Sequence, residues 1–185
     1  MKQIVNVNAS WGIGREGDLL CSLPEDMKYF RRMTRGKTVI MGRATLESFP
    51  GKAPLKNRVN IVITRDPARI PAESLAAAEA AQERGGKTRL VVVTSPEEAL
   101  QAAAAAEPEG SLEEVYVIGG GSIYRSLLAS CDTCYVTFND CPAEADTFYP
   151  DLEADPEWIC TDPGEEQVSE NGTRYRFAVY RRKDL

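Results

Sequence analysis

The amino-acid sequence predicts an α/β fold with a predominantly parallel sheet and flanking helices. Short apolar segments rich in β-branched residues recur along the chain, and helix-like segments separate them, which is the alternation typical of this fold class. Most of these segments are continuously apolar rather than alternating, as expected for strands that are covered on both faces. The expected strands are residues 4–7, 38–41, 59–64, 90–94, 115–118 and 135–138.

The expected helices have recognisable ends. Pro24–Thr34 begins with proline and two acidic residues and stops before Gly36. Residues 95–106 open with Ser-Pro-Glu-Glu, an N-cap followed by proline at the first helical position. Residues 122–129 predict a shorter helix, and the Ala- and Glu-rich residues 72–86 predict a surface helix that ends at two glycines.

The C-terminal part of the chain predicts a different arrangement. Residues 158–161 and 174–181 have strand character and flank the turn-forming sequence Glu-Asn-Gly-Thr at residues 170–173, so we expect an antiparallel hairpin. Since neither an internal repeat nor a linker interrupts the chain, residues 1–185 are expected to form a single domain.

Composition excludes several classes of protein. The balance of 43% hydrophobic and 27% charged residues is ordinary for a folded chain and unlike that of a disordered one. No apolar run approaches the roughly 20 residues that span a bilayer, and the N-terminus lacks the layout of a signal peptide, so a cytoplasmic location is expected. The net charge of −6 argues against a nucleic-acid-binding surface, which needs clustered Lys and Arg.

The residue inventory limits the chemistry that the chain can perform. The sequence has five cysteines and no histidine, so the lone Cys-x-x-C formed by Cys131 and Cys134 lacks the further ligands of a zinc site. We therefore expect reduced thiols with a packing role and no metal. Acid–base chemistry must depend on carboxylates, Tyr, Lys, Cys or water.

Three consecutive glycines, Gly119, Gly120 and Gly121, follow a buried strand at the start of an expected helix. Glycines let the backbone approach a ligand closely, and the free N–H groups at a helix start attract phosphate. Because the spacing differs from the G-x-G-x-x-G fingerprint, two interpretations stay open: a contact to a phosphate or dinucleotide, and a tight structural turn.

Two arginines follow the carboxyl ends of other expected strands. Arg43 and Thr45 come shortly after residues 38–41, and Arg65 comes after residues 59–64. Ligands of α/β folds bind outside the carboxyl ends of the strands, where a guanidinium can hold phosphate. Either arginine alone could be a solvated loop cation, but the convergence of three strand ends favours a ligand site.

Asp26 differs from the other acid in the first turn of its helix. The helix dipole explains Glu25, because it favours acids in a first turn. Asp26 instead shares a face with Phe30 and Met33, which form the apolar stripe expected to face inward. A carboxylate there is costly unless it meets a cation or a polar ligand, and desolvation should raise its pKa.

Residues 9–20 connect the first expected strand to this helix. They combine glycines with apolar residues, in Trp-Gly-Ile-Gly at 11–14 and Gly-Asp-Leu-Leu at 17–20. Such a connection is either a mobile lid over a pocket or a plain long loop.

In this order, the motifs resemble those of the dihydrofolate reductase family over residues 4–179, nearly the whole chain. Each motif alone is weak evidence, whereas the ordered set is specific. The set is Gly12-Ile13-Gly14, Gly17-Asp18-Leu19, Leu23-Pro24-x-Asp26-x-x-x-Phe30, Val39-Ile40-Met41-Gly42-Arg43-x-Thr45-x-Glu47-Ser48, Pro54-Leu55-x-x-Arg58, Ile118-Gly119-Gly120-Gly121 and Asp146-Thr147.

The resemblance implies an eight-stranded sheet and a pterin pocket around Asp26. Asp26 would be the sole ionisable side chain in that pocket and would bind the ring's amino and N3 groups, supported by Thr137 through its hydroxyl and a water. The lid residue Leu20 belongs with them to the implied catalytic group, and Arg58 would bind the carboxylate of the glutamate tail. The implied substrate-binding residues are Ile4, Val5, Asn6, Met27, Phe30, Phe49, Leu55, Arg58, Ile118 and Tyr124.

The same resemblance implies NADPH as the hydride donor. Arg65 is the candidate for its 2′-phosphate, and because family members have a cis peptide between paired glycines, one is expected at Gly119-Gly120. The implied cofactor-binding residues are Asn6, Ile13, Gly14, Gly42, Arg43, Ala44, Thr45, Thr64, Arg65, Gly119, Gly120, Gly121, Ser122 and Ile123.

The implied activity is reduction of 7,8-dihydrofolate to 5,6,7,8-tetrahydrofolate, with hydride transfer to C6 and protonation of N5, which supplies one-carbon and thymidylate metabolism. A buried carboxylate would favour the protonated ring, and water admitted by the lid would bring the proton, so no histidine is required. The implied ligands are dihydrofolate and diaminopyrimidine antifolates. We expect a monomer that binds neither nucleic acid nor membrane.

Three positions depart from the family pattern. Cys21 stands where the family usually has Trp, whose indole helps to fix an active-site water. Asn6 stands where a small Ala is common, so its side chain must find room or a partner. Ser122 replaces a frequent Arg, which leaves more of the 2′-phosphate recognition to Arg65 and Arg43.

Two other functions are weighed against this one. The related reductase of riboflavin synthesis acts on a ribosylaminopyrimidine and shares the fold and the glycine loop, but Asp26 after Leu23-Pro24, together with Arg58, favours folate. A non-catalytic protein that binds NADPH or folate is the second alternative, and Cys21 and Asn6 leave it open.

Overall fold

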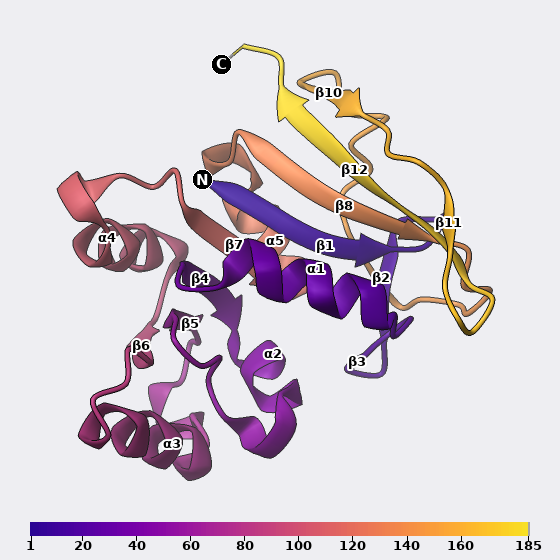
Figure 1. The fold of residues 1–185 in the computed structure, drawn as a ribbon. Coiled ribbons are helices and arrows are strands. Elements are labelled where there is room, and N and C mark those ends of the chain that lie inside the picture. The colour runs from indigo at the N-terminus through magenta and orange to yellow at the C-terminus, as the bar shows by residue number, and fades with distance from the viewer. Residues whose placement is uncertain (185) are drawn as a thin grey trace. The chain divides into compact units, whose positions relative to one another are not determined.

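The computed structural model describes residues 1–184, which form two compact units. The middle unit comprises Met1 and Thr34–Leu127. The terminal unit comprises Lys2–Met33 and the residues from Leu128 onward. Figure 1 labels the helices and strands of both.

The middle unit contains a four-stranded parallel sheet in the order β7-β4-β5-β6. Helices join the strands, as crossover connections between parallel strands require. The strands are β4 (Thr38–Gly42), β5 (Val59–Ile63), β6 (Arg89–Val93) and β7 (Val115–Gly119). The helices are α2 (Arg43–Ser48), α3 (Ala72–Glu83), α4 (Pro96–Ala106) and α5 (Gly121–Leu127).

Burial in the middle unit confirms the interpretation of its apolar segments. Successive residues of β4, among them Val39, Ile40 and Met41, have no exposed surface, so both faces of the strand are covered. The expected N-cap of α4 is also present, because Ser95 Oγ accepts a hydrogen bond from Glu98 N at 3.1 Å. The expected surface helix at residues 72–86 ends at Glu83, and a 3-10 turn follows α5.

The terminal unit contains four main strands in the order β10-β12-β8-β1 (Figure 1). β1 and β8 are parallel, whereas β12 runs antiparallel to both β8 and β10, which confirms the expected C-terminal hairpin. α1 (Pro24–Thr34) packs against β12, where the rings of Tyr29 and Phe177 stack at 4.2 Å between centroids. The strands are β1 (Lys2–Val7), β8 (Thr133–Asn139), β10 (Trp158–Asp162) and β12 (Arg174–Arg182), with the short β11 (Gln167–Val168) paired to β12.

The connection between β1 and α1 is more ordered than a plain loop. β2 (Gly12–Arg15) pairs antiparallel with β3 (Asp18–Leu19) and with β9 (Thr147–Phe148), which forms a second, three-stranded sheet. The plain-loop interpretation of residues 9–20 is therefore wrong. We call residues 9–20 the lid segment.

The expected fold class is confirmed. Four main strands in each unit make eight, most of them parallel, with helices beside them and antiparallel strands at the C-terminal end. Among residues 1–184, no helix combines the length and the apolar character needed to cross a membrane.

Candidate active site

Asp26 lies in the first turn of α1, in the terminal unit, and its side chain is partly buried. Burial raises the pKa of the Asp26 carboxyl, while the nearby polar side chains of Thr137 and Asn6 lower it. The expectation of a desolvated carboxylate on the inward face of this helix is met. Burial therefore makes the ionised form of Asp26 less favourable, and two polar side chains nearby partly offset this effect.

Thr137 in β8 lies near Asp26. The residue has no exposed surface, and its Oγ1 has no direct hydrogen-bond partner among residues 1–184. It nevertheless lies near enough to Asp26 to lower the pKa of that carboxyl. The water-mediated interaction with Asp26 that the family resemblance implies stays a prediction.

Asn6 in β1 finds the partners that its polar side chain requires. Its Nδ2 donates to the backbone oxygen of Cys21 at 3.2 Å, and its Oδ1 accepts from Nδ2 of Asn139 at 2.7 Å. Sequence reasoning missed Asn139. Asn139 could have been found from its position two residues after Thr137, because alternate residues of a strand lie on the same face.

The lid segment is tied to the loop that precedes β9. Oδ2 of Asp146 accepts a hydrogen bond from Glu16 N at 2.8 Å, and its Oδ1 accepts from the Thr147 hydroxyl at 2.9 Å. At the other end of the segment, Oδ1 of Asn8 accepts from Gly12 N at 2.9 Å. In the sequence, Asp146 is only one residue of a family motif, and no role could be predicted for it.

Leu20 closes the lid segment with its side chain half-buried. Its backbone oxygen accepts from the Cys141 thiol at 3.7 Å, and its backbone N–H donates to Ile13 at 3.2 Å. The adjacent Cys21 interacts with Cys141. The pKa of Cys21 is raised to about 12, mainly by burial and also by the neighbouring Cys141 thiol. Cys21 is therefore a neutral thiol near pH 7.

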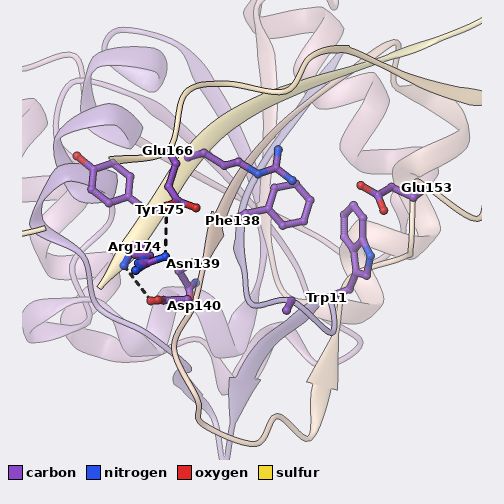
Figure 2. A pocket seen from close by; sticks show the side chains of 10 residues that line it. Trp11, Phe138, Asn139, Asp140, Glu153, Glu166, Arg174 and Tyr175 are labelled. Carbon is purple, nitrogen blue, oxygen red and sulfur yellow. Dashed lines mark hydrogen bonds and ion pairs between the residues drawn. The ribbon is translucent and has the colours of Figure 1, made fainter. Parts of the chain in front are cut away.

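A pocket of about 410 Å³ in the terminal unit is lined in part by Asn139 and by Ala9 and Trp11 of the lid segment. Figure 2 shows Phe138 and Trp11 in its wall, with Arg174 between Asp140 and Glu166. Because strand side chains alternate, Phe138 occupies the face of β8 opposite to Thr137. Arg174 pairs with Glu166, Arg176 lies over the Phe138 ring, and none of the expected site residues lines the pocket.

In the middle unit, the glycine loop meets the start of α2. A side-chain carbon placed on Gly119 would lie 3.2 Å from the Thr45 hydroxyl and 3.6 Å from that of Tyr124, and one on Gly42 would lie 3.1 Å from Ile123. Gly119 has φ of 132°, a region that L-residues rarely adopt, and the expected cis peptide joins it to Gly120. Because β4 and β7 are paired and parallel, their carboxyl ends present these groups at one edge.

The two expected arginines differ in their surroundings. Nη1 of Arg43 lies 2.5 Å from Oε1 of Glu47, one turn later in α2, so this guanidinium already has an anionic partner. Arg65 is exposed, and no ion pair involves it within residues 1–184. Thr64, directly before it, is buried, and its hydroxyl contacts the backbone of Asp66. Of the two guanidinium groups, that of Arg43 is paired with a carboxylate and that of Arg65 is exposed.

Arg58 is buried and held by backbone and side-chain groups of its own unit. Its Nε donates to Thr34 O at 3.1 Å and to the Thr34 hydroxyl at 3.2 Å, and its Nη1 donates to Lys56 O at 3.0 Å. These bonds fix the plane of the guanidinium, as bidentate recognition of a carboxylate requires. Leu55 is fixed as well, by two hydrogen bonds between its backbone and the Asn60 amide.

The structure brings the expected residues together in two groups. The terminal unit gathers Asn6, Asp26, Thr137 and Leu20, and also carries Ile4, Val5, Ile13, Gly14, Met27 and Phe30; Met27 is 40% exposed. The remaining expected substrate and cofactor residues belong to the middle unit, where the glycine loop lies beside Thr45 and Tyr124.

Comparison with known proteins gives one consistent result. A family model described as dihydrofolate reductase matches residues 1–182. The chain is 34% identical to the dihydrofolate reductase of Aedes albopictus over 189 residues, covering 96% of this chain and 94% of the relative. It is 37% identical to that of Mycobacterium tuberculosis over 180 residues, covering 92% and 90%. A solved structure of dihydrofolate reductase from Enterococcus faecalis, complexed with NADP(H) and RAB-propyl, is similar with a TM-score of 0.76 and 30% identity, covering 99% of this chain and 96% of that one. The chain therefore belongs to the dihydrofolate reductase family.

Proposed function

We infer that this chain reduces 7,8-dihydrofolate to 5,6,7,8-tetrahydrofolate with NADPH, and that Asp26 is the residue on which the pterin ring binds. The observation that carries the assignment is the partly buried Asp26 carboxylate, bordered by Thr137 and Asn6. Such a carboxylate can accept hydrogen bonds from the ring's amino and N3 groups and favour a positive charge on the ring. Protonation at N5 is then assisted electrostatically, with water as the carrier of the proton.

The glycine loop suits the proposed cofactor. The absence of side chains at Gly119 and Gly120 leaves the backbone beside Thr45 open to a close approach, and Arg65 offers an exposed cation. We assign Thr45, the glycine loop and Thr64 to the phosphates and Arg65 to the 2′-phosphate. When bound, NADPH supplies the hydride that adds to C6 of the substrate.

The experiment that tests the function is the rate of NADPH oxidation by the purified protein with dihydrofolate, beside a control without folate. Folate-dependent oxidation of NADPH is the expected result. Binding of both ligands without turnover would favour a non-catalytic binding protein, and turnover of a ribosylaminopyrimidine alone would favour the reductase of riboflavin synthesis.

Replacing Arg65 by Ala should reduce the preference for NADPH over NADH. A charge-assisted hydrogen bond to phosphate contributes about 1.5–3 kcal/mol, so the KM for NADPH should rise on the order of tenfold or more while the KM for NADH stays the same. Arg84→Ala is the matched control, because Arg84 is exposed and precedes the amino end of β6 rather than following the carboxyl end of a strand. Equal KM values for NADPH in Arg65→Ala and the parent would remove Arg65 from this role.

Replacing Asp146 by Ala should loosen the lid segment. Because Glu16 N donates to this carboxylate, kcat/KM for dihydrofolate should fall severalfold, and amide exchange in residues 9–20 should speed up. Hydrogen bonds from Glu16 and Thr147 lower the pKa of Asp146, so the contact is complete above the ordinary Asp pKa and is lost only as pH falls through the lowered value.

Asp151→Ala is the control for this variant, since Asp151 is also an exposed carboxylate that accepts from backbone N–H groups, at Glu153 and Ala154. Unchanged amide exchange in residues 9–20 of Asp146→Ala would contradict a role for Asp146 in ordering the lid segment.

Four further properties stay predictions. We propose that diaminopyrimidine antifolates bind against Asp26 and that the enzyme is a cytoplasmic monomer in which residues 1–185 fold as one domain. Light scattering of the purified protein tests the monomer, and a single cooperative unfolding transition by several probes tests the single domain.

A further inference from the structure

The five cysteines of the chain lie in three kinds of environment. Cys131 and Cys134 are 1% and 0% exposed, so a dissolved oxidant does not reach their thiols. Cys160 is exposed on β10. Cys21 and Cys141 are both half-buried, and the fold brings them together from positions about 120 residues apart along the chain.

The sulfur of Cys141 lies against the peptide group that precedes Cys21. Its Sγ donates to the backbone oxygen of Leu20 at 3.7 Å, and that carbonyl belongs to the same planar peptide unit as the nitrogen and Cα of Cys21. The two thiols also interact with each other. A disulfide joins Cα atoms that are about 4.4–6.8 Å apart, a range within reach of a sulfur that already contacts the peptide unit of its partner.

A pair of asparagine amides holds both cysteines by their backbones. Nδ2 of Asn6 donates to Cys21 O at 3.2 Å, and Cys141 N donates to Oδ1 of Asn139 at 3.0 Å. The two amides are joined as well, because Nδ2 of Asn139 donates to Oδ1 of Asn6 at 2.7 Å. Three hydrogen bonds therefore connect the two cysteine backbones, in addition to the sulfur contact.

We propose that Cys21 and Cys141 are a redox modification site: a small-molecule disulfide oxidises them to an intramolecular disulfide that ties the end of the lid segment to the residues after β8. Two protein thiols and one oxidant R–S–S–R give one bond between the two Sγ atoms and two molecules of R–SH. Two electrons and two protons thus pass from the protein to the oxidant, and a reducing dithiol reverses the reaction.

The surroundings of the thiols determine the order of the two steps. The pKa of Cys21 is raised to about 12, first by burial and then by the Cys141 thiol, so Cys21 stays protonated near pH 7 and the first attack falls to Cys141. That attack forms a mixed disulfide on Cys141 and releases one R–SH. Cys21 then attacks the Cys141 sulfur and displaces the second. Because capping Cys141 removes its contribution to the raised pKa of Cys21, the first step favours the second.

The disulfide would restrain the lid segment at the end that leads into α1. In the reduced protein, the contact between Leu20 O and the Cys141 thiol is a single weak hydrogen bond that can open. A covalent bond at the next residue does not open, so motion of residues 9–20 should decrease. The effect on turnover rests on the proposed function, whereas formation of the disulfide does not.

The test is incubation of the reduced, full-length protein with oxidised glutathione, followed by mass spectrometry and peptide mapping. The parent should lose two hydrogen atoms and give a linked pair of peptides that contain Cys21 and Cys141, and dithiothreitol should restore the reduced mass. Cys21→Ser should stop at a glutathione adduct on Cys141. Cys160→Ser is the matched control, because it removes the exposed thiol on β10 and should leave the linked pair unchanged.

Two further readouts follow the lid segment. Amide exchange in residues 9–20 should slow severalfold in the oxidised parent and stay the same in Cys21→Ser given the same treatment. The kcat for dihydrofolate should fall severalfold on oxidation and recover with dithiothreitol.

A parent that carries only glutathione adducts, or a bond between other cysteines, would overturn the proposal. Unchanged amide exchange in residues 9–20 of the oxidised parent would overturn the restraint of the lid segment. If Cys21→Ser does not fold, the peptide map of the parent beside that of Cys160→Ser decides. The mass and exchange measurements need no turnover, so a failure of the proposed activity would leave their outcome unchanged.

Discussion

Replacing Asp26 by Asn should lower kcat/KM for dihydrofolate at pH 7 by about a hundredfold or more, the range expected when a group that assists proton transfer is lost. The neutral amide cannot favour the protonated ring as the partly buried carboxylate does. Activity should recover partly in acid, where the substrate carries its own proton. The measurement is the pH profile of kcat/KM for both proteins.

Glu25→Gln is the matched control, since Glu25 precedes Asp26 in the same helical turn but accepts from the Ser169 hydroxyl at 2.9 Å. This variant should keep the parent's profile. Equal kcat/KM at pH 7 in Asp26→Asn and the parent would remove Asp26 from the role proposed for it.

Loss of folding would not explain a low activity of Asp26→Asn. Burial raises the pKa of Asp26, so this group contributes stability below its unfolded-state pKa, and the contribution is lost as pH rises through the folded-state value. Above the folded-state pKa, the desolvated Asp26 carboxylate therefore opposes folding. Asn carries no charge, and the variant should unfold at a temperature equal to or above that of the parent, as thermal denaturation would measure.

The fold could be predicted where one residue pattern determines one local structure. The continuous apolar run of β4 has a single stable placement, covered on both faces, and the Ser95 cap marks the start of α4 within one residue. β2 and β3 could not be predicted in this way. They are short and glycine-rich, and they are strands because they pair with each other and with β9, about 130 residues away along the chain.

The candidate site also has a part that the sequence predicts and a part that depends on strand pairing. The location of Asp26 follows from helical spacing, because Phe30 and Met33 share its face. The contacts of Asn6 and Asn139 depend instead on the pairing of β1 with β8, which places Asn6 opposite Thr137. A single sequence does not specify that register. Asn6 could therefore be recognised as unusual for the family, but its hydrogen-bond partners Cys21 and Asn139 could not be predicted.

Replacing Gly119 by Ala should weaken both folding and NADPH binding. Gly119 has φ of 132°, and an L-residue held in such a region costs about 1–3 kcal/mol of stability. The added carbon would also lie 3.2 Å from the Thr45 hydroxyl and force that side chain to move. Because Thr45 is assigned to the cofactor, the Kd for NADPH should rise on the order of tenfold, the effect of about one lost hydrogen bond to a charged group.

Gly120→Ala separates the two effects. A side-chain carbon at Gly120 would lie 3.7 Å from the Thr45 hydroxyl, an ordinary contact, and the φ of this residue lies outside the positive region. Its loss of stability should therefore be smaller than that of Gly119→Ala, whereas its NADPH affinity should still fall, because the methyl group occupies backbone surface that the cofactor approaches. Thermal unfolding and NADPH fluorescence titration measure the two quantities. Gly119→Ala with the parent's melting temperature would contradict the strain at this position, and Gly120→Ala with the parent's affinity would mean that the loop is a structural turn and not a cofactor contact.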